Sequence, residues 1–152
     1  MDDPLEIFPE IPHGKQSWYG MLSGIWQSVW VESRAASHIQ RVKISTDGEQ
    51  VRVEVIRRGD FTAGLTAEIF DSNGVRVAQI AAREPLFSLQ VPHPQLWSPN
   101  EPNLYTLKVS THNDEVTETF GFRTIETQDG RILLNGHPFY MRAALDQDYY
   151  PL

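Results

Sequence analysis

The sequence contains no cysteine among its 152 residues. This absence excludes disulfide bonds, thiolate zinc sites, iron–sulfur clusters and cysteine nucleophiles. No two histidines have the spacing of metal ligands, and the five are His13, His38, His93, His112 and His137. We therefore expect no metal site, and no sequence feature indicates a cofactor.

The sequence is also poor in basic residues and has no long apolar run. It has 13 Lys and Arg against 20 Asp and Glu, so its formal net charge is −7. A nucleic acid partner would favour the opposite sign. No apolar run approaches the about 20 residues that cross a bilayer, so we expect no membrane contact. The start Met1-Asp2-Asp3-Pro4 lacks the positive charge of a signal peptide, which favours a cytoplasmic location.

What is present is typical of a globular protein. Hydrophobic residues make up 40% and aromatic residues 11% of the sequence, which argues against general disorder. At about 100–200 residues per domain, the length allows one domain, or one domain with pieces of its neighbours.

Between residues 38 and 123, short segments alternate apolar and polar residues with the period of two that gives a β-strand one apolar face. Turn signals such as Asp47-Gly48 and Asp71–Gly74 separate them. No convincing helical pattern interrupts the series. About seven strands in this stretch predict an all-β fold, an antiparallel β-sandwich of immunoglobulin-like size. The expected strands lie near residues 39–44, 51–56, 65–69, 75–77, 87–91, 105–110 and 116–122.

Further strands are expected on either side of the sandwich. Residues 25–33 are rich in β-branched and aromatic side chains and predict one strand. After residue 123, the pattern predicts a hairpin of residues 124–127 and 132–134 and then a short strand at Phe139–Ala143. Asp129-Gly130 and Asn135-Gly136 are the turn signals there. The length of the chain allows these flanking strands to be pieces of neighbouring domains.

A proline-rich loop, His93–Asn103, precedes the strand that begins at Tyr105. We expect Trp97 and Tyr105 to attach this loop to the sandwich, with the Tyr105 hydroxyl hydrogen-bonded to backbone.

Four strings in this order and spacing resemble glycoside hydrolase family 2, the β-galactosidase, β-glucuronidase and β-mannosidase group. They are SGIWQSVWVE at 23–32, LWSPNEPNLYTL at 96–107, FGFRTIE at 120–126 and ILLNGHPFYMRA at 132–143. The resemblance implies three parts: residues 1–36 as the tail of a sugar-binding jelly roll, 37–123 as an immunoglobulin-like sandwich, and 124–152 as the lead-in hairpin and first strand of a (β/α)₈ barrel.

The resemblance also implies where the chemistry lies. Retaining glycosidases use two carboxylates about 5–5.5 Å apart, and this family supplies them as glutamates from later barrel strands. We therefore expect no catalytic residue in this chain. Arg142, Asp146 and Asp148 follow the expected strand Tyr140–Ala143, and barrel strands end at the active site. They are candidate substrate-binding residues of the full-length parent, although exposed polar side chains without a substrate role fit the pattern equally well. Arg142 matches the family pattern, whereas Ala143–Asp148 departs from it.

Three functions remain open. The first is a non-catalytic sandwich that holds the jelly roll and the barrel of a carbohydrate-cleaving enzyme, with a possible share in a homo-oligomer interface. The second is a stand-alone carbohydrate-binding module that uses Trp18, Trp26 and Trp30 as a stacking platform, although such aromatics more often form core. The third is an interaction or adhesion domain, which would leave ILLNGHPFYMRA unexplained.

Overall fold

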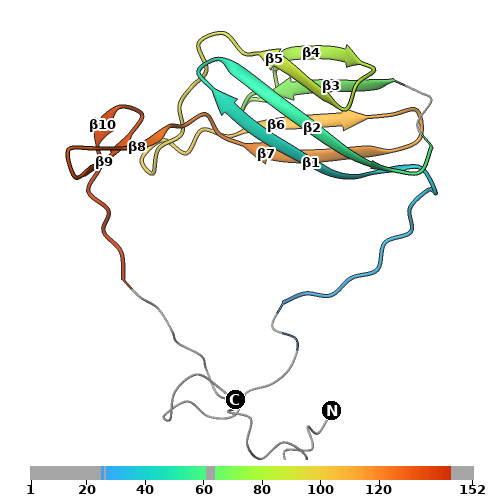
Figure 1. Cartoon of the computed structure of the whole chain (residues 1–152), viewed down its shortest axis with the longest axis horizontal. Helices are drawn as coiled ribbons and strands as arrows, with labels where there is room; N and C mark the ends of the chain where they lie inside the picture. Colours follow the sequence, from blue (N-terminus) through green and yellow to red (C-terminus); the bar gives the residue numbers. More distant parts are fainter. Residues whose placement is uncertain (1–24, 26, 61–63, 145–152) are drawn as a thin grey trace, which may run out of the picture. The chain divides into compact units, whose positions relative to one another are not determined.

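The computed structural model describes residues 25, 27–60 and 64–144. The chain divides into two units, Met1–Ser33 and Arg34–Leu152, and every strand below belongs to the second. Within the described residues, no helix is long and apolar enough to cross a membrane. The strands, shown in Figure 1, are β1 (His38–Asp47), β2 (Gln50–Arg58), β3 (Leu65–Phe70), β4 (Arg76–Ala82), β5 (Leu86–Gln90), β6 (Tyr105–Ser110), β7 (Glu115–Phe120), β8 (Ile125–Gln128), β9 (Arg131–Leu134) and β10 (His137–Pro138).

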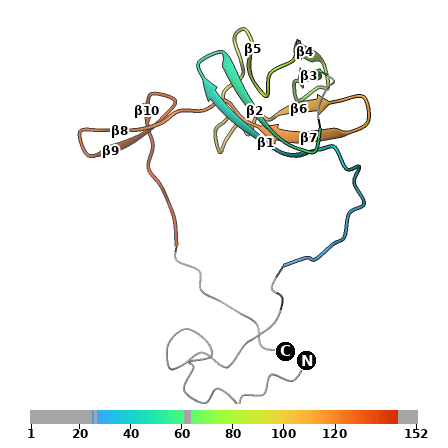
Figure 2. The same cartoon turned by 45° about the vertical axis from the view of Figure 1, so that its right-hand side comes forward.

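The first seven strands form the β-sandwich that the alternation predicts. One sheet has the order β1-β2-β5 and the other has the order β4-β3-β6-β7, and every pairing within them is antiparallel. Figures 1 and 2 show the two sheets from directions 45° apart. The prediction of an all-β, antiparallel sandwich is confirmed.

The core lies between these sheets and follows directly from the alternation. Val51, Val53 and Val55 of β2 are buried, whereas Arg52 and Glu54 between them are exposed. Strands β3 and β6 bury alternate residues in the same way. All buried residues of the described chain are hydrophobic, so the core is stabilised by apolar packing. They are Ile39, Val42, Val51, Val53, Val55, Leu65, Ala67, Ile69, Leu89, Val91, Tyr105, Leu107, Val109 and Phe122.

The third sheet has the order β10-β9-β8, and two tight turns connect its strands. Asp129 and Gly130 have φ angles of 50° and 71°, and Asn135 and Gly136 have φ angles of 53° and 77°. Two successive positive φ angles are the signature of a type I′ hairpin turn, which selects Asp-Gly and Asn-Gly. The two turn predictions are thus confirmed.

Two predicted strands are wrong. The described residues within 25–33 form no strand, and residues 139–144 form none either. The last strand is instead His137–Pro138, which pairs with β9. An alternating pattern only makes a segment suitable for a sheet, because a strand also needs a neighbour that satisfies its backbone groups. Neither segment has a paired neighbour among the described residues.

Candidate functional site at the joint between sandwich and hairpin

The proline-rich loop is tied to the sandwich through Trp97. The backbone N–H of Trp97 donates to the carbonyl of Phe122 at 2.7 Å, and Leu96 forms a parallel bridge with Phe122. The Phe122 side chain is buried in the core. A Cβ atom at Gly121 would lie only 3.0 Å from the Trp97 Cβ, so a residue without a side chain allows this close approach.

Tyr105 attaches the other side of the same loop. Its hydroxyl accepts a hydrogen bond from the backbone N–H of Gln95 at 2.9 Å. Its ring packs edge-on against Phe122, with the ring centroids 5.0 Å apart. The prediction that Trp97 and Tyr105 attach the loop to the sandwich is therefore confirmed.

Asn135 connects the C-terminal hairpin to this loop. Its Nδ2 donates to the carbonyl of Trp97 at 3.1 Å, and its Oδ1 accepts from the backbone N–H of Thr124 at 3.0 Å. Its own backbone N–H donates to the carbonyl of Thr124 at 3.0 Å. The Arg123 guanidinium lies over the Trp97 ring, 4.8 Å from its centroid, which is a cation–π contact. We call Trp97, Arg123, Thr124 and Asn135 the joint.

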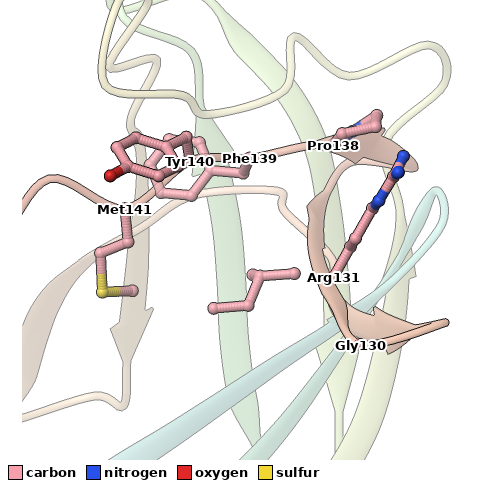
Figure 3. Close-up of a pocket in the computed structure, with 7 residues that line it drawn as sticks. Gly130, Arg131, Pro138, Phe139, Tyr140 and Met141 are labelled. Atoms are coloured by element: carbon pink, nitrogen blue, oxygen red, sulfur yellow. The ribbon is translucent and has the colours of Figure 1, made fainter.

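A shallow cavity of about 550 Å³ lies on the hairpin beyond the joint. Figure 3 shows the rings of Phe139 and Tyr140 on one side and the Arg131 side chain on the other. Its lining residues are Gly130, Arg131, Ile132, Pro138, Phe139, Tyr140 and Met141. This lining contains no carboxylate, so it does not include the pair of carboxylates that a retaining glycosidase uses.

Of the three predicted substrate-binding residues, the structure describes Arg142. It is exposed and directly follows Met141, which lines the cavity. Asp146 and Asp148 lie outside the described residues, so a substrate site formed by the three stays a prediction. Within the described part, no three His, Asp or Glu side chains lie close enough together to hold a metal ion.

Of the three tryptophans in the alternative sugar platform, only Trp30 is described, and Trp18 and Trp26 lie outside the described residues. The Trp30 side chain is 71% exposed, and its Nε1 donates to Glu32 Oε1 at 3.1 Å. It lines a shallow cavity of about 470 Å³ with Ile25, Gln27 and Ser28. Trp30 is therefore not part of a core within the described residues.

The sequence pattern did not identify Asn135 or Arg123 as functional residues. The Asn-Gly pair indicated a turn, and FGFRTIE marked the segment that contains Arg123. One partner of the Asn135 side chain, the Trp97 carbonyl, however, lies 38 residues earlier in the chain. No local pattern reports a contact over that separation.

The family model for glycosyl hydrolases family 2 matches residues 25–123, which include the whole sandwich. The chain belongs to glycosyl hydrolase family 2. It is 28% identical over 135 residues to a β-galactosidase of Staphylococcus xylosus, covering 85% of this chain and 13% of that protein. It is 28% identical over 152 residues to a putative β-glucuronidase of Formosa agariphila, covering 88% of this chain and 18% of that protein.

The solved structure of a β-glucuronidase of Faecalibacterium prausnitzii matches this family 2 member with a TM-score of 0.62 and 31% identity. The match covers 68% of this chain and 17% of that one. The chain thus spans between 13% and 18% of the length of these relatives.

Proposed function

We propose that this chain is a non-catalytic part of a longer retaining glycosidase and that its sandwich holds the domains on either side in fixed positions. The division into residues 1–36, 37–123 and 124–152 belongs to the same proposal. The small share of each relative that the chain spans supports it, and so does the family match centred on the sandwich. The observation that carries it is the joint, in which the Asn135 side chain bonds to the Trp97 carbonyl of the proline-rich loop and the Arg123 guanidinium lies over the Trp97 ring.

A spacer of this kind needs a fixed entry as well as a fixed exit. At the entry, Asp114 Oδ2 accepts from the backbone N–H of Ile39 at 2.7 Å. Gly59 lies against the same segment, because a Cβ there would be 2.6 Å from the carbonyl oxygen of Ala36. At the exit, Asn135 bonds to Trp97. Anchors at both ends support a role in setting the positions of the preceding and following chain.

The relatives' names support a β-galactoside or a β-glucuronide as the substrate of the whole protein. The two carboxylates that a retaining mechanism requires would come from a part of the protein outside this chain. Arg142 would donate hydrogen bonds to the sugar, since a guanidinium carries five N–H donors, and Asp146 and Asp148 would accept them from hydroxyl groups. Partner contacts would therefore be the carbohydrate and the adjoining jelly-roll and barrel domains.

The test is to purify the longest polypeptide encoded by the gene that contains this segment and to assay it with chromogenic β-galactoside and β-glucuronide. We expect cleavage of at least one, with retention of the anomeric configuration. A gene that encodes no more than these 152 residues would contradict the proposal, and so would a longer polypeptide that cleaves neither substrate.

The exposed Trp30 beside Glu32 favours one alternative, a stand-alone carbohydrate-binding module. An exposed indole with a neighbouring carboxylate combines an apolar stacking face with a hydrogen-bond acceptor. Ile25, Val29 and Val31 are also 73–97% exposed, however, which fits a segment that lacks its packing partner. Titration of the chain with galactosides, glucuronides and mannosides, followed by tryptophan fluorescence, separates the two. A saturable change that Trp30→Ala removes would favour the module.

A further inference from the structure

The Asn135 side chain makes two hydrogen bonds that require both of its amide atoms. The backbone N–H of Thr124 can only donate, so it needs Oδ1, and the carbonyl of Trp97 can only accept, so it needs Nδ2. The orientation of the amide is therefore set by its partners. Aspartate supplies only acceptors at neutral pH, so among residues of this shape asparagine alone can make both bonds.

The backbone of Asn135 also suits this residue. Its φ of 53° lies in the left-handed region, which asparagine enters more readily than most residues other than glycine. Glycine would keep the turn but would lose both side-chain bonds. The position therefore combines a requirement of the turn with a contact between two distant segments.

Only one of the two bonds leaves the hairpin. Thr124 immediately precedes β8 and pairs with Asn135 next to the β8–β9 ladder, whereas Trp97 lies in the proline-rich loop. Figure 1 shows β8, β9 and β10 beyond the ends of the sandwich strands. None of the buried core residues of the described chain lies in these three strands. Contacts outside the buried core, among them those of the joint, therefore set their orientation.

We infer that Asn135 is a positioning residue that fixes the orientation of the β8–β9–β10 hairpin, and with it the segment leading to Arg142, relative to the sandwich. The backbone N–H of Phe139 donates to the carbonyl of Ile132 at 2.8 Å, so the beginning of this segment is hydrogen-bonded to the hairpin. Arg142 comes three residues later. The consequence for substrate binding rests on the proposed function, whereas the positioning itself can be measured without any substrate.

The experiment uses the 152-residue chain, labelled with ¹⁵N and weakly aligned, and measures backbone residual dipolar couplings of β1–β7 and β8–β10. In the unmodified chain, we expect one alignment tensor to fit both sets. In Asn135→Asp, a carboxylate oxygen would face the Trp97 carbonyl oxygen. We therefore expect the residual dipolar couplings of β8–β10 to decrease and no longer to fit the alignment tensor of β1–β7. The Thr124 amide should stay protected from hydrogen exchange, because its acceptor remains.

Asn135→Gly removes both bonds while it keeps the positive φ. We expect the hairpin to leave the common fit again, and the Thr124 amide to exchange about five- to tenfold faster, as the loss of one hydrogen bond implies. The matched control is Asp129→Gly, at the corresponding position of the β8–β9 turn with a φ of 50°. This variant should change neither readout.

The inference is overturned if the unmodified chain already needs two tensors, or if Asn135→Asp keeps a single one. It is also overturned if Asp129→Gly separates the hairpin as strongly, because turn flexibility would then explain the effect. A second tensor in the unmodified chain would also count against the fixed exit of the proposed spacer role, but none of these results bears on the glycosidase activity of the parent. Conversely, a parent that cleaves no glycoside would leave a positive coupling result valid.

Discussion

The hydroxyl of Tyr105 accepts a hydrogen bond from the backbone N–H of Gln95 at 2.9 Å, across ten residues of chain. The Tyr105 side chain is only 5% exposed, so its ring packs in the core while its hydroxyl reaches the proline-rich loop. One side chain thereby contributes to the sandwich core and to the loop that carries Trp97.

Tyr105→Phe should lower the free energy of unfolding by about 1 kcal/mol, because it removes one hydrogen bond and keeps the ring. Tyr105→Ala should lower it by about 3–5 kcal/mol, because the missing ring leaves a cavity. Urea unfolding followed by tryptophan fluorescence measures both. Tyr140→Phe is the control, since Tyr140 is 83% exposed and should not change the midpoint. Equal effects at the two tyrosines would refute the role of the Tyr105 hydroxyl.

Asp114→Ala should lower the free energy of unfolding by about 1–3 kcal/mol. The carboxylate accepts from the N–H of Ile39, a fully buried residue, and its removal leaves that donor unpaired. Asp114→Asn keeps an acceptor oxygen and should cost less. Thermal unfolding of the unmodified chain and the two variants ranks their stabilities. An Asp114→Asn variant as unstable as Asp114→Ala would count against this explanation.

Gly59→Ala should destabilise the sandwich more than Gly48→Ala. Both glycines have positive φ, at 85° and 55°, so each substitution introduces left-handed strain of about 1–2 kcal/mol. Only at Gly59 would the new Cβ also meet backbone atoms, 2.6 Å from the Ala36 oxygen and 2.8 Å from the Ser37 Cα, whereas nothing lies within 4 Å at Gly48. Melting temperatures compare the pair directly, and equal decreases would show that the entry segment does not constrain Gly59.

Lys108 should titrate above its usual pKa. Its Nζ lies 2.8 Å from Glu115 Oε2, and this hydrogen bond, together with the carboxylate charge, raises the pKa above 10.5. Because the pKa is higher in the folded than in the unfolded state, the pair stabilises the fold below about pH 10.5, and this contribution is lost as pH rises through the raised pKa. NMR titration of the Lys108 side chain measures the shift. Glu115→Gln should reduce it, and an unchanged titration in that variant would contradict the assignment.

The sandwich could be predicted from sequence because its determinants are local. Val51, Val53 and Val55 alternate with charged residues, and Asp129-Gly130 and Asn135-Gly136 occupy turns that require positive φ. The bond of the Tyr105 hydroxyl to backbone was also expected, and its partner lies only ten residues away. Each of these features depends on a residue and its immediate surroundings in the chain.

The remaining features depend on contacts between distant residues. The Asp114–Ile39 bond spans 75 residues and the Asn135–Trp97 bond spans 38. The same limit explains the two wrong strands, since the pattern of residues 25–33 and 139–143 is suitable for strands but says nothing about the presence of a partner. For the candidate site, only the position of Arg142 could be compared, because Asp146 and Asp148 lie outside the described residues.

We propose that this chain supports a glycosidase without carrying its chemistry. The most direct measurement is the hydrolysis of chromogenic β-glucuronide and β-galactoside by the purified 152-residue chain, at high protein concentration and over a long incubation, beside a complete family 2 β-glucuronidase as positive control. We predict that the chain releases no more chromophore than buffer does. Release that is proportional to the concentration of the chain and that persists through repeated purification would contradict the claim.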